Sequence, residues 1–98
     1  MSENAPSASI SRVALVTGGG QGLGRAGAEA LRRNGVTVVL ADIDGMLAER
    51  TAAELNAIGG ANGATVSSMQ LDVADEESVS RAFAEVGKIH GRLDVLVN

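Results

Sequence analysis

The sequence predicts an α/β fold in which helices pack on both faces of a doubly wound, parallel sheet. Short apolar segments alternate with helix-length segments along most of the chain. The segments between successive strands are long enough to hold a helix, which is the connection that parallel strands need. In addition, the first apolar segment runs into a glycine-rich loop, and a helix-compatible segment follows at once.

The first two strands and the helix between them are the clearest elements. Val13–Thr17 is a continuous apolar segment, typical of a strand that is buried on both faces of a parallel sheet. A helix should run from Gly22 to about Asn34, where an Asn-Gly pair is a common helix stop. The β-branched segment 36–41 predicts a second strand that ends at Asp42. The expected buried face of the helix contains Leu23, Ala26, Ala30 and Leu31.

The rest of the chain repeats this alternation. A second helix is expected over 45–58, a weaker third strand over 65–71, a third helix from about residue 75 to residue 90, and a fourth strand over 93–97. The acidic start of the third helix suits the positive end of its dipole. The expected buried positions recur at helical spacing. They are Leu47, Thr51, Leu55 and Ile58 on the second helix, and Val79, Ala82, Phe83, Val86 and Ile89 on the third.

Composition limits the chain to one small domain and excludes several functions. The chain has 98 residues, a net charge of −4, one His and no Cys. Its scattered basic residues argue against nucleic acid or an anionic membrane as a partner, and the lack of Cys excludes disulfides and thiolate metal sites. We expect a flexible polar leader over 1–11, one domain over 12–98, no metal site, no membrane-spanning segment and a cytoplasmic location.

Five glycines within residues 18–24 follow the first strand directly. A P-loop is excluded, because glycines at 19 and 24 would place Arg25-Ala26 where Lys and Ser or Thr are needed. The pattern Gly-x-Gly-x-x-Gly fits residues 22–27, but it begins five residues after the strand ends. The pattern Thr-Gly-x-x-x-Gly-x-Gly fits residues 17–24 and begins at the strand end. Gly27, inside the helix, is expected to allow close approach to the sheet.

Three segments make the chain resemble the short-chain dehydrogenase/reductase family. Residues 16–25 are similar to the family's cofactor loop, Leu-Asp-Val at 71–73 to its adenine-contacting turn, and Leu-Val-Asn at 96–98 to the start of its Asn-Asn-Ala-Gly segment. The resemblance covers nearly everything after the leader, and it implies a Rossmann-like, NAD-binding domain that stops after its fourth strand. The candidate cofactor-binding residues are Gly18, Gln21, Gly22, Leu23, Gly24, Asp42, Ile43, Asp72, Val73 and Asn98.

Asp42 ends the second strand, 18 residues after Gly24. Dinucleotide-binding folds place an acid about 20 residues after the glycines, where it accepts hydrogen bonds from the adenosine ribose. A carboxylate there would repel the 2′-phosphate of NADP, and Gln21 is neutral, so NAD is favoured over NADP. The alternative is that Asp42 is a turn acid or a helix cap, although Asp44 is better placed for the cap.

The remaining assignments follow from the resemblance. It implies that the Asp72 side chain and the Val73 N–H contact adenine, that Ile43 packs against the adenine ring, and that Asn98 lines the ribose. For Asp72, a cap for the helix that begins near Asp75 is the alternative.

The catalytic residues of the family are missing from this chain. The family uses a Tyr acid/base with a Lys four positions later, supported by a Ser and an Asn, whereas this chain has no Tyr, and Lys88 is its one Lys. We therefore expect the cofactor-binding half of a longer, homo-oligomeric, NAD-dependent oxidoreductase that interconverts secondary alcohols and ketones of small-molecule substrates. The alternative is a non-catalytic NAD-binding or regulatory module. The half alone should be inactive, and it should be poorly soluble or depend on a partner, because its fourth strand would leave an apolar sheet edge uncovered.

Overall fold

The computed structural model describes residues 12–59 and 63–98, which form one parallel sheet with helices on both faces. The expected leader over 1–11, and residues 60–62 of the connection after the second helix, lie outside the described residues. The strands are β1 (Val13–Thr17), β2 (Thr37–Asp42), β3 (Val66–Gln70) and β4 (Val95–Val97). The helices are α2 (Gly22–Arg33), α3 (Gly45–Ile58) and α4 (Glu76–His90).

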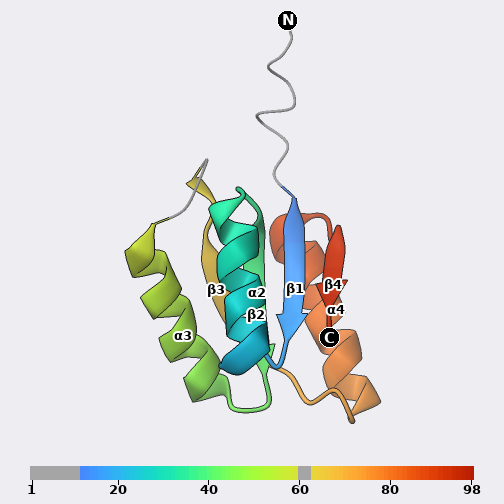
Figure 1. Cartoon of the computed structure of the whole chain (residues 1–98). Coiled ribbons are helices and arrows are strands. Elements are labelled where there is room, and N and C mark those ends of the chain that lie inside the picture. Colours follow the sequence, from blue (N-terminus) through green and yellow to red (C-terminus); the bar gives the residue numbers. More distant parts are fainter. Residues whose placement is uncertain (1–11, 60–62) are drawn as a thin grey trace, which may run out of the picture.

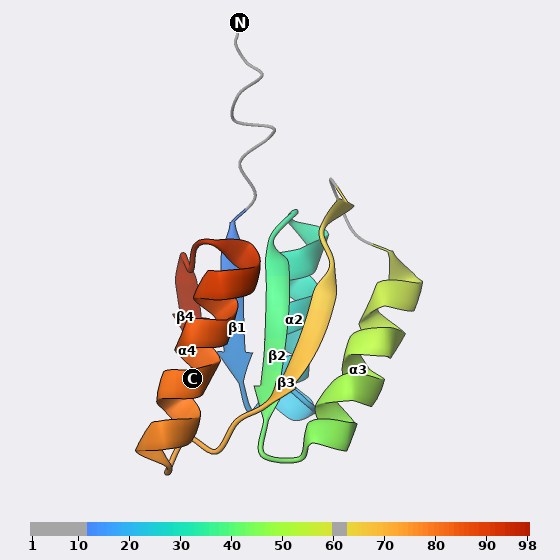
Figure 2. The ribbon, with the colours of Figure 1, turned by 180° about the vertical axis from the view of Figure 1, so that it is seen from behind.

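The strand order β3-β2-β1-β4 explains where the helices lie. The chain moves outward from β1 through β2 to β3 and then returns past β1 to β4, with every neighbouring pair parallel. Right-handed crossovers then put α2 and α3 on one face and α4 on the other. Figures 1 and 2 show these two faces. The predicted doubly wound parallel sheet is confirmed.

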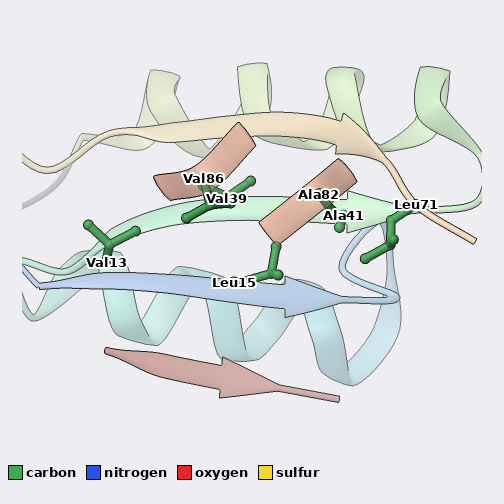
Figure 3. Packing of buried hydrophobic residues seen from close by; sticks show 7 residues of the cluster. All are labelled: Val13, Leu15, Val39, Ala41, Leu71, Ala82 and Val86. Carbon is green, nitrogen blue, oxygen red and sulfur yellow. The ribbon is translucent and has the colours of Figure 1, made fainter. Parts of the chain in front are cut away.

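The core consists of two apolar layers, one on each face of the sheet. Side chains alternate along a strand, so neighbouring residues of β1 enter different layers. The layer under α4 contains Val13, Leu15, Val39, Ala41, Leu71, Ala82 and Val86 (Figure 3). The layer under α2 and α3 contains Val16, Ala28, Val38, Leu40, Ala52, Leu55 and Val66.

The buried face of α2 agrees with the expected one only at Leu31, which packs against the layer under α2 and α3. Leu23 is 92% exposed, and the fully covered positions of this helix are Ala28 and Arg32. The reason is Gly24, which lies against the glycine loop and thereby sets the rotation of the helix. Positions 24, 28 and 32 follow at four-residue spacing and share one face. Arg32 tolerates burial because its guanidinium donates to the carbonyl oxygens of Leu55 (2.6 Å) and Ala64 (3.0 Å).

The other two helices bury fewer positions than expected. Ile58 at the end of α3 is 60% exposed, and on α4 Phe83 and Ile89 are 40% and 62% exposed. On α4 the contact with the sheet is made mainly by Ala82 and Val86, with Val79 packed at its margin. No helix among the described residues is both long enough and apolar enough to cross a membrane.

Candidate functional site

Three loops meet at the edge of the sheet where the strands end. They are the glycine loop between β1 and α2, the turn between β2 and α3, and the turn between β3 and α4 (lower edge of the sheet in Figure 1). Parallel strands bring all their carboxyl ends to one edge, which is where open α/β sheets bind their ligands. The candidate residues predicted from the sequence therefore belong to a single edge of the molecule.

The glycine loop needs glycine for two different reasons. Gly18 and Gly22 have φ values of +64° and +63°, the left-handed region that side chains disfavour. Gly24 instead permits close contact, because a Cβ atom there would lie 2.3 Å from the carbonyl oxygen of Gly18 and 2.8 Å from the Cα of Gly19. The start of α2 is thus pressed directly against the loop. This geometry fits the pattern that starts at Thr17 better than the one that starts at Gly22.

Gly27 does not have the role expected from the sequence. A Cβ atom at Gly27 would meet nothing within 4 Å outside its own helix. Close approach of α2 to the sheet is therefore not the reason for this glycine. The close backbone contact of α2 is made one turn earlier, by Gly24, and it is a contact with the glycine loop.

The N-terminus of α2 lacks the side-chain cap that the other two helices have. Asp44 caps α3 by accepting from the Leu47 N–H (3.0 Å), as expected, and Asp75 caps α4 by accepting from the Glu77 N–H (3.0 Å). The N-cap of α2 is Gln21, whose side chain makes no such bond, and its first turn holds no acid. The first N–H groups of α2 and the positive end of its dipole thus remain available to an anion.

Asp42 lies directly beside the glycine loop. Its Oδ2 accepts from the Gly20 N–H (3.1 Å) and its Oδ1 accepts from the Asp44 N–H (3.0 Å). Both partners are backbone groups, and each carboxylate oxygen keeps room for a further hydrogen bond. Asp42 therefore joins the loop to the start of α3 and remains an acceptor at the ligand edge, whereas the helix cap is Asp44.

Thr51 is a loop contact that the sequence did not single out. Its hydroxyl, buried on α3, donates to the carbonyl oxygen of Gly20 (2.6 Å). From the sequence alone, Thr51 was one member of an apolar helix face. The available signal was its polarity, because a hydroxyl on a buried face requires a hydrogen-bond partner.

At the β3 side of the edge, the structure brings Ile43 and Asp72 together. Both line a groove of about 570 Å³ between β3 and α4, which does not include the glycine loop. The Asp72 carboxylate accepts from the Ala74 N–H (3.0 Å), so Asp72 shapes the turn, and the cap of α4 is Asp75. Ile43 and Val73 are 62% and 63% exposed, which leaves two apolar surfaces at this end of the site.

Asn98 lies at the other side of the edge. The Thr17 hydroxyl lies within hydrogen-bonding distance of two acceptors, the Asn98 Oδ1 (2.8 Å) and the Val97 carbonyl oxygen (3.2 Å), and thereby joins the ends of β1 and β4. Because β3 and β4 are the two outer strands, Asp72 and Asn98 flank the glycine loop on opposite sides. The candidate residues form an extended track along the sheet edge and do not gather in one compact pocket.

Some charged side chains outside this track have structural partners. Arg25 on α2 pairs with Glu54 on α3, and this hydrogen bond holds the pKa of the Glu54 carboxyl below its usual value. His90, the single histidine of the chain, lies at the groove between β3 and α4. Within the described ranges, no three acidic or histidine side chains are grouped so that they could hold a metal ion.

Comparisons with known proteins agree with this geometry. A family model described as short chain dehydrogenase matches residues 12–98. An uncharacterized oxidoreductase of Thermotoga maritima is 42% identical over 87 residues, which cover 89% of this chain and 32% of the relative. A sorbitol dehydrogenase of Cereibacter sphaeroides is 41% identical over 87 residues, which cover 89% of this chain and 31% of the relative.

Solved structures give the same result. Menthone neomenthol reductase from Mentha piperita matches with a TM-score of 0.83 and 36% identity, over 92% of this chain and 31% of that protein. The chain thus spans about a third of the length of the relatives that it matches. With the family model covering residues 12–98, the chain belongs to the short-chain dehydrogenase family.

Proposed function

We propose that this chain is the NAD-binding part of an oxidoreductase that interconverts secondary alcohols and ketones. The observation that carries the proposal is the contact between the glycine loop and Asp42, in which the Gly20 N–H donates to the carboxylate (3.1 Å). The contact supports the proposal, because the uncapped start of α2 would bind the anion and the neighbouring Asp42 carboxylate would accept from the ribose hydroxyls. A dinucleotide needs both, at adjacent positions.

The residues present fit such a cofactor. The pyrophosphate would lie at the uncapped start of α2, where the helix begins at Gly22 and a Cβ atom at that residue would face open space. The residues that would hold it there are Gly18, Gln21, Gly22, Leu23 and Gly24. Asp42 would accept from the adenosine ribose. The remaining candidate residues lie on the flanks of the track: Ile43, Asp72 and Val73 for adenine, and Asn98 for the ribose on the nicotinamide side.

The environment of Asp42 favours NAD over NADP. The hydrogen bonds that the structure gives this carboxylate come from backbone N–H groups and not from a cationic side chain. Among the described residues no ion pair compensates its negative charge, so it would repel a 2′-phosphate on the ribose. Gln21, which follows Gly20 in the loop, has no positive charge that could bind a 2′-phosphate.

The bound cofactor would supply hydride transfer between a secondary alcohol and a ketone. The chain contains no Tyr, so the acid/base that moves the proton of the alcohol is assigned to sequence outside these 98 residues. The substrate is proposed to be a small molecule with a secondary alcohol or ketone, in keeping with relatives named for sorbitol and for menthone. A cytoplasmic location and a homo-oligomeric parent enzyme belong to the same proposal.

The lack of Tyr in all 98 residues also favours a second candidate, a non-catalytic NAD-binding or regulatory module. Both candidates share the cofactor site and differ in chemistry. Sequencing the source gene beyond codon 98 separates them. An open reading frame with Tyr-x-x-x-Lys supports the enzyme, and a stop codon directly after Asn98 supports the module.

Titration of the chain with NADH and NADPH tests the cofactor assignment. The fluorescence of the reduced nicotinamide can be excited at wavelengths where protein side chains do not absorb, so it reports binding directly. We expect saturable binding of NADH, weaker binding of NADPH, and no oxidation of a panel of secondary alcohols with NAD. Tighter binding of NADPH would contradict the choice of NAD, and turnover by this chain alone would contradict the assignment of the acid/base to other sequence.

A further inference from the structure

Thr51 is one of two polar residues that are almost fully buried in the described part of the chain, the other being Arg32. Its side chain is 2% exposed, and its neighbours on the buried face of α3 are Ala48, Ala52 and Leu55. A Val at this position would fill nearly the same volume without a polar group. The Thr51 hydroxyl has one recorded partner, the carbonyl oxygen of Gly20 at 2.6 Å.

This hydrogen bond fixes the direction of a whole peptide group. The described chain has no cis peptide bond, so the carbonyl of Gly20 and the N–H of Gln21 point in opposite directions. Because Thr51 draws the carbonyl toward α3, the Gln21 N–H points away from α3. Gln21 is an exposed residue at the N-cap of α2, so this donor lies on the solvent side of the loop.

The N–H group of Gly20 is held as well. Its N–H donates to Asp42 (3.1 Å), and a Cβ atom at this position would lie 2.7 Å from Leu47 and 2.9 Å from the Asp42 carboxylate. The residue is thus held by α3 through its carbonyl and by the end of β2 through its N–H. Glycine peptides flip easily, because glycine populates positive and negative φ about equally. Loss of the Thr51 bond would free the peptide between Gly20 and Gln21.

We propose that Thr51 is a positioning residue for the NAD site. It acts through Gly20: its hydroxyl orients the Gly20–Gln21 peptide so that the Gln21 N–H faces the cofactor while the Gly20 N–H holds the Asp42 carboxylate. The proposal rests on the proposed NAD-binding function. It adds a residue outside the glycine motif, from the next helix along the chain, to the machinery that prepares the loop.

Four variants of the chain test this role. Thr51→Val removes the hydroxyl and keeps the shape of the side chain, and Thr51→Ser keeps the hydroxyl. Thr51→Ser and Thr51→Ala both lack the γ-methyl group and differ from each other only in the hydroxyl. Leu55→Val is the matched control. Leu55 is buried one turn further along α3, in the layer under α2 and α3, and the side-chain hydrogen bond that its carbonyl oxygen accepts comes from Arg32 and not from the glycine loop. The readouts are the dissociation constant for NADH, the urea midpoint, and the amide resonance of Gln21 without ligand.

We expect Thr51→Val to raise the dissociation constant about tenfold, the effect of about one hydrogen bond. The ligand-free Gln21 resonance should move in Thr51→Val, and Thr51→Ser should restore both properties to within about twofold of the original affinity. Leu55→Val should lower the urea midpoint without changing NADH affinity or the Gln21 resonance. Unchanged affinity and an unchanged Gln21 resonance in folded Thr51→Val would overturn the proposal.

Two further outcomes are decisive. If Thr51→Val does not fold, equal NADH affinities of Thr51→Ser and Thr51→Ala overturn the proposal, and a difference of about tenfold supports it. If the unmodified chain does not bind NADH, the proposed function fails. The ligand-free Gln21 resonance then still tests whether Thr51 orients this peptide, and an unchanged resonance overturns that role.

Discussion

Replacing Gly24 and Gly27 one at a time by Ala should change stability in opposite directions. Both residues lie in α2, three positions apart, and the structure gives them different surroundings from those that the sequence suggested. At Gly24 a Cβ atom would lie 2.3 Å from the carbonyl oxygen of Gly18, which is backbone and cannot rotate away. At Gly27 a Cβ atom would meet nothing within 4 Å. The two substitutions add the same methyl group to different surroundings.

The magnitudes follow from two opposing effects. Alanine is favoured over glycine within a helix by about 1 kcal/mol. Overpacking costs about 1–3 kcal/mol, and a contact as short as that at Gly24 belongs at the upper end of this range. We therefore expect Gly24→Ala to lower the free energy of unfolding by about 2 kcal/mol, and Gly27→Ala to raise it by up to about 1 kcal/mol.

Urea unfolding followed by circular dichroism measures both changes, and NADH titration of the folded variants measures the effect on the site. Gly24→Ala should also weaken NADH binding at least about tenfold, because the loop has to move to admit the methyl group. Gly27→Ala should leave NADH binding unchanged. The reasoning is refuted if Gly24→Ala is as stable as the original chain, or if Gly27→Ala destabilises it.

Three aspartates give further predictions with different readouts. Asp42→Asn should weaken NADH binding about tenfold or more and narrow the preference for NADH over NADPH, as titration with both would show; an unchanged preference would argue against the ribose role. Asp44→Ala should lower the free energy of unfolding in urea by about 1 kcal/mol, because it removes the N-cap of α3, and should leave NADH affinity unchanged. Weaker NADH binding by this variant would instead assign the ligand role to Asp44. The hydrogen bond from Arg92, and to a smaller extent that from the Val13 N–H, lowers the pKa of Asp94 below its usual 3.8. The ionised carboxylate therefore stabilises the fold at neutral pH, and this stabilisation is lost as the pH falls below 3.8 and Asp94 becomes protonated. Asp94→Asn should accordingly be less stable than the original chain at neutral pH, and the gap should close in acid; a gap independent of pH would exclude this cause.

The order of elements could be predicted from the sequence because apolar runs and glycines mark strand and helix ends directly. The first strand was predicted with its observed bounds, Val13–Thr17, and the end of the second at Asp42 agrees as well. The parallel sheet follows from the helix-length connections, since parallel strands cannot be joined by short turns. These features depend on local sequence and on chain connectivity.

The rotation of α2 could not be predicted in the same way. Helical periodicity suggested a face that includes Leu23, but the close contact between Gly24 and Gly18 turns Ala28 and Arg32 inward instead. Burial of an arginine depends on carbonyl partners that come from α3 and from the segment before β3. Such partners are known only once the tertiary arrangement is known.

The candidate site shows the same division. The glycine pattern and the position of Asp42 after β2 are visible in the sequence, and the structure brings Asp42 to the loop through Gly20. The contact from Thr51 joins residues 31 positions apart, and the polarity of Thr51 signals that it needs a partner without saying which residue that partner is. Likewise, the sequence cannot say which of Gly24 and Gly27 lies against backbone, because that depends on how the helix packs.

NAD is expected to lie along the carboxyl edge of the sheet, over the glycine loop. Amide chemical shifts of the ¹⁵N-labelled chain, recorded during titration with NAD, test it most directly. The account predicts the largest changes within residues 18–24, with further changes at Asp42, Ile43, Asp72 and Val73. Shifts confined to the groove between β3 and α4, with the glycine loop unaffected, would contradict it.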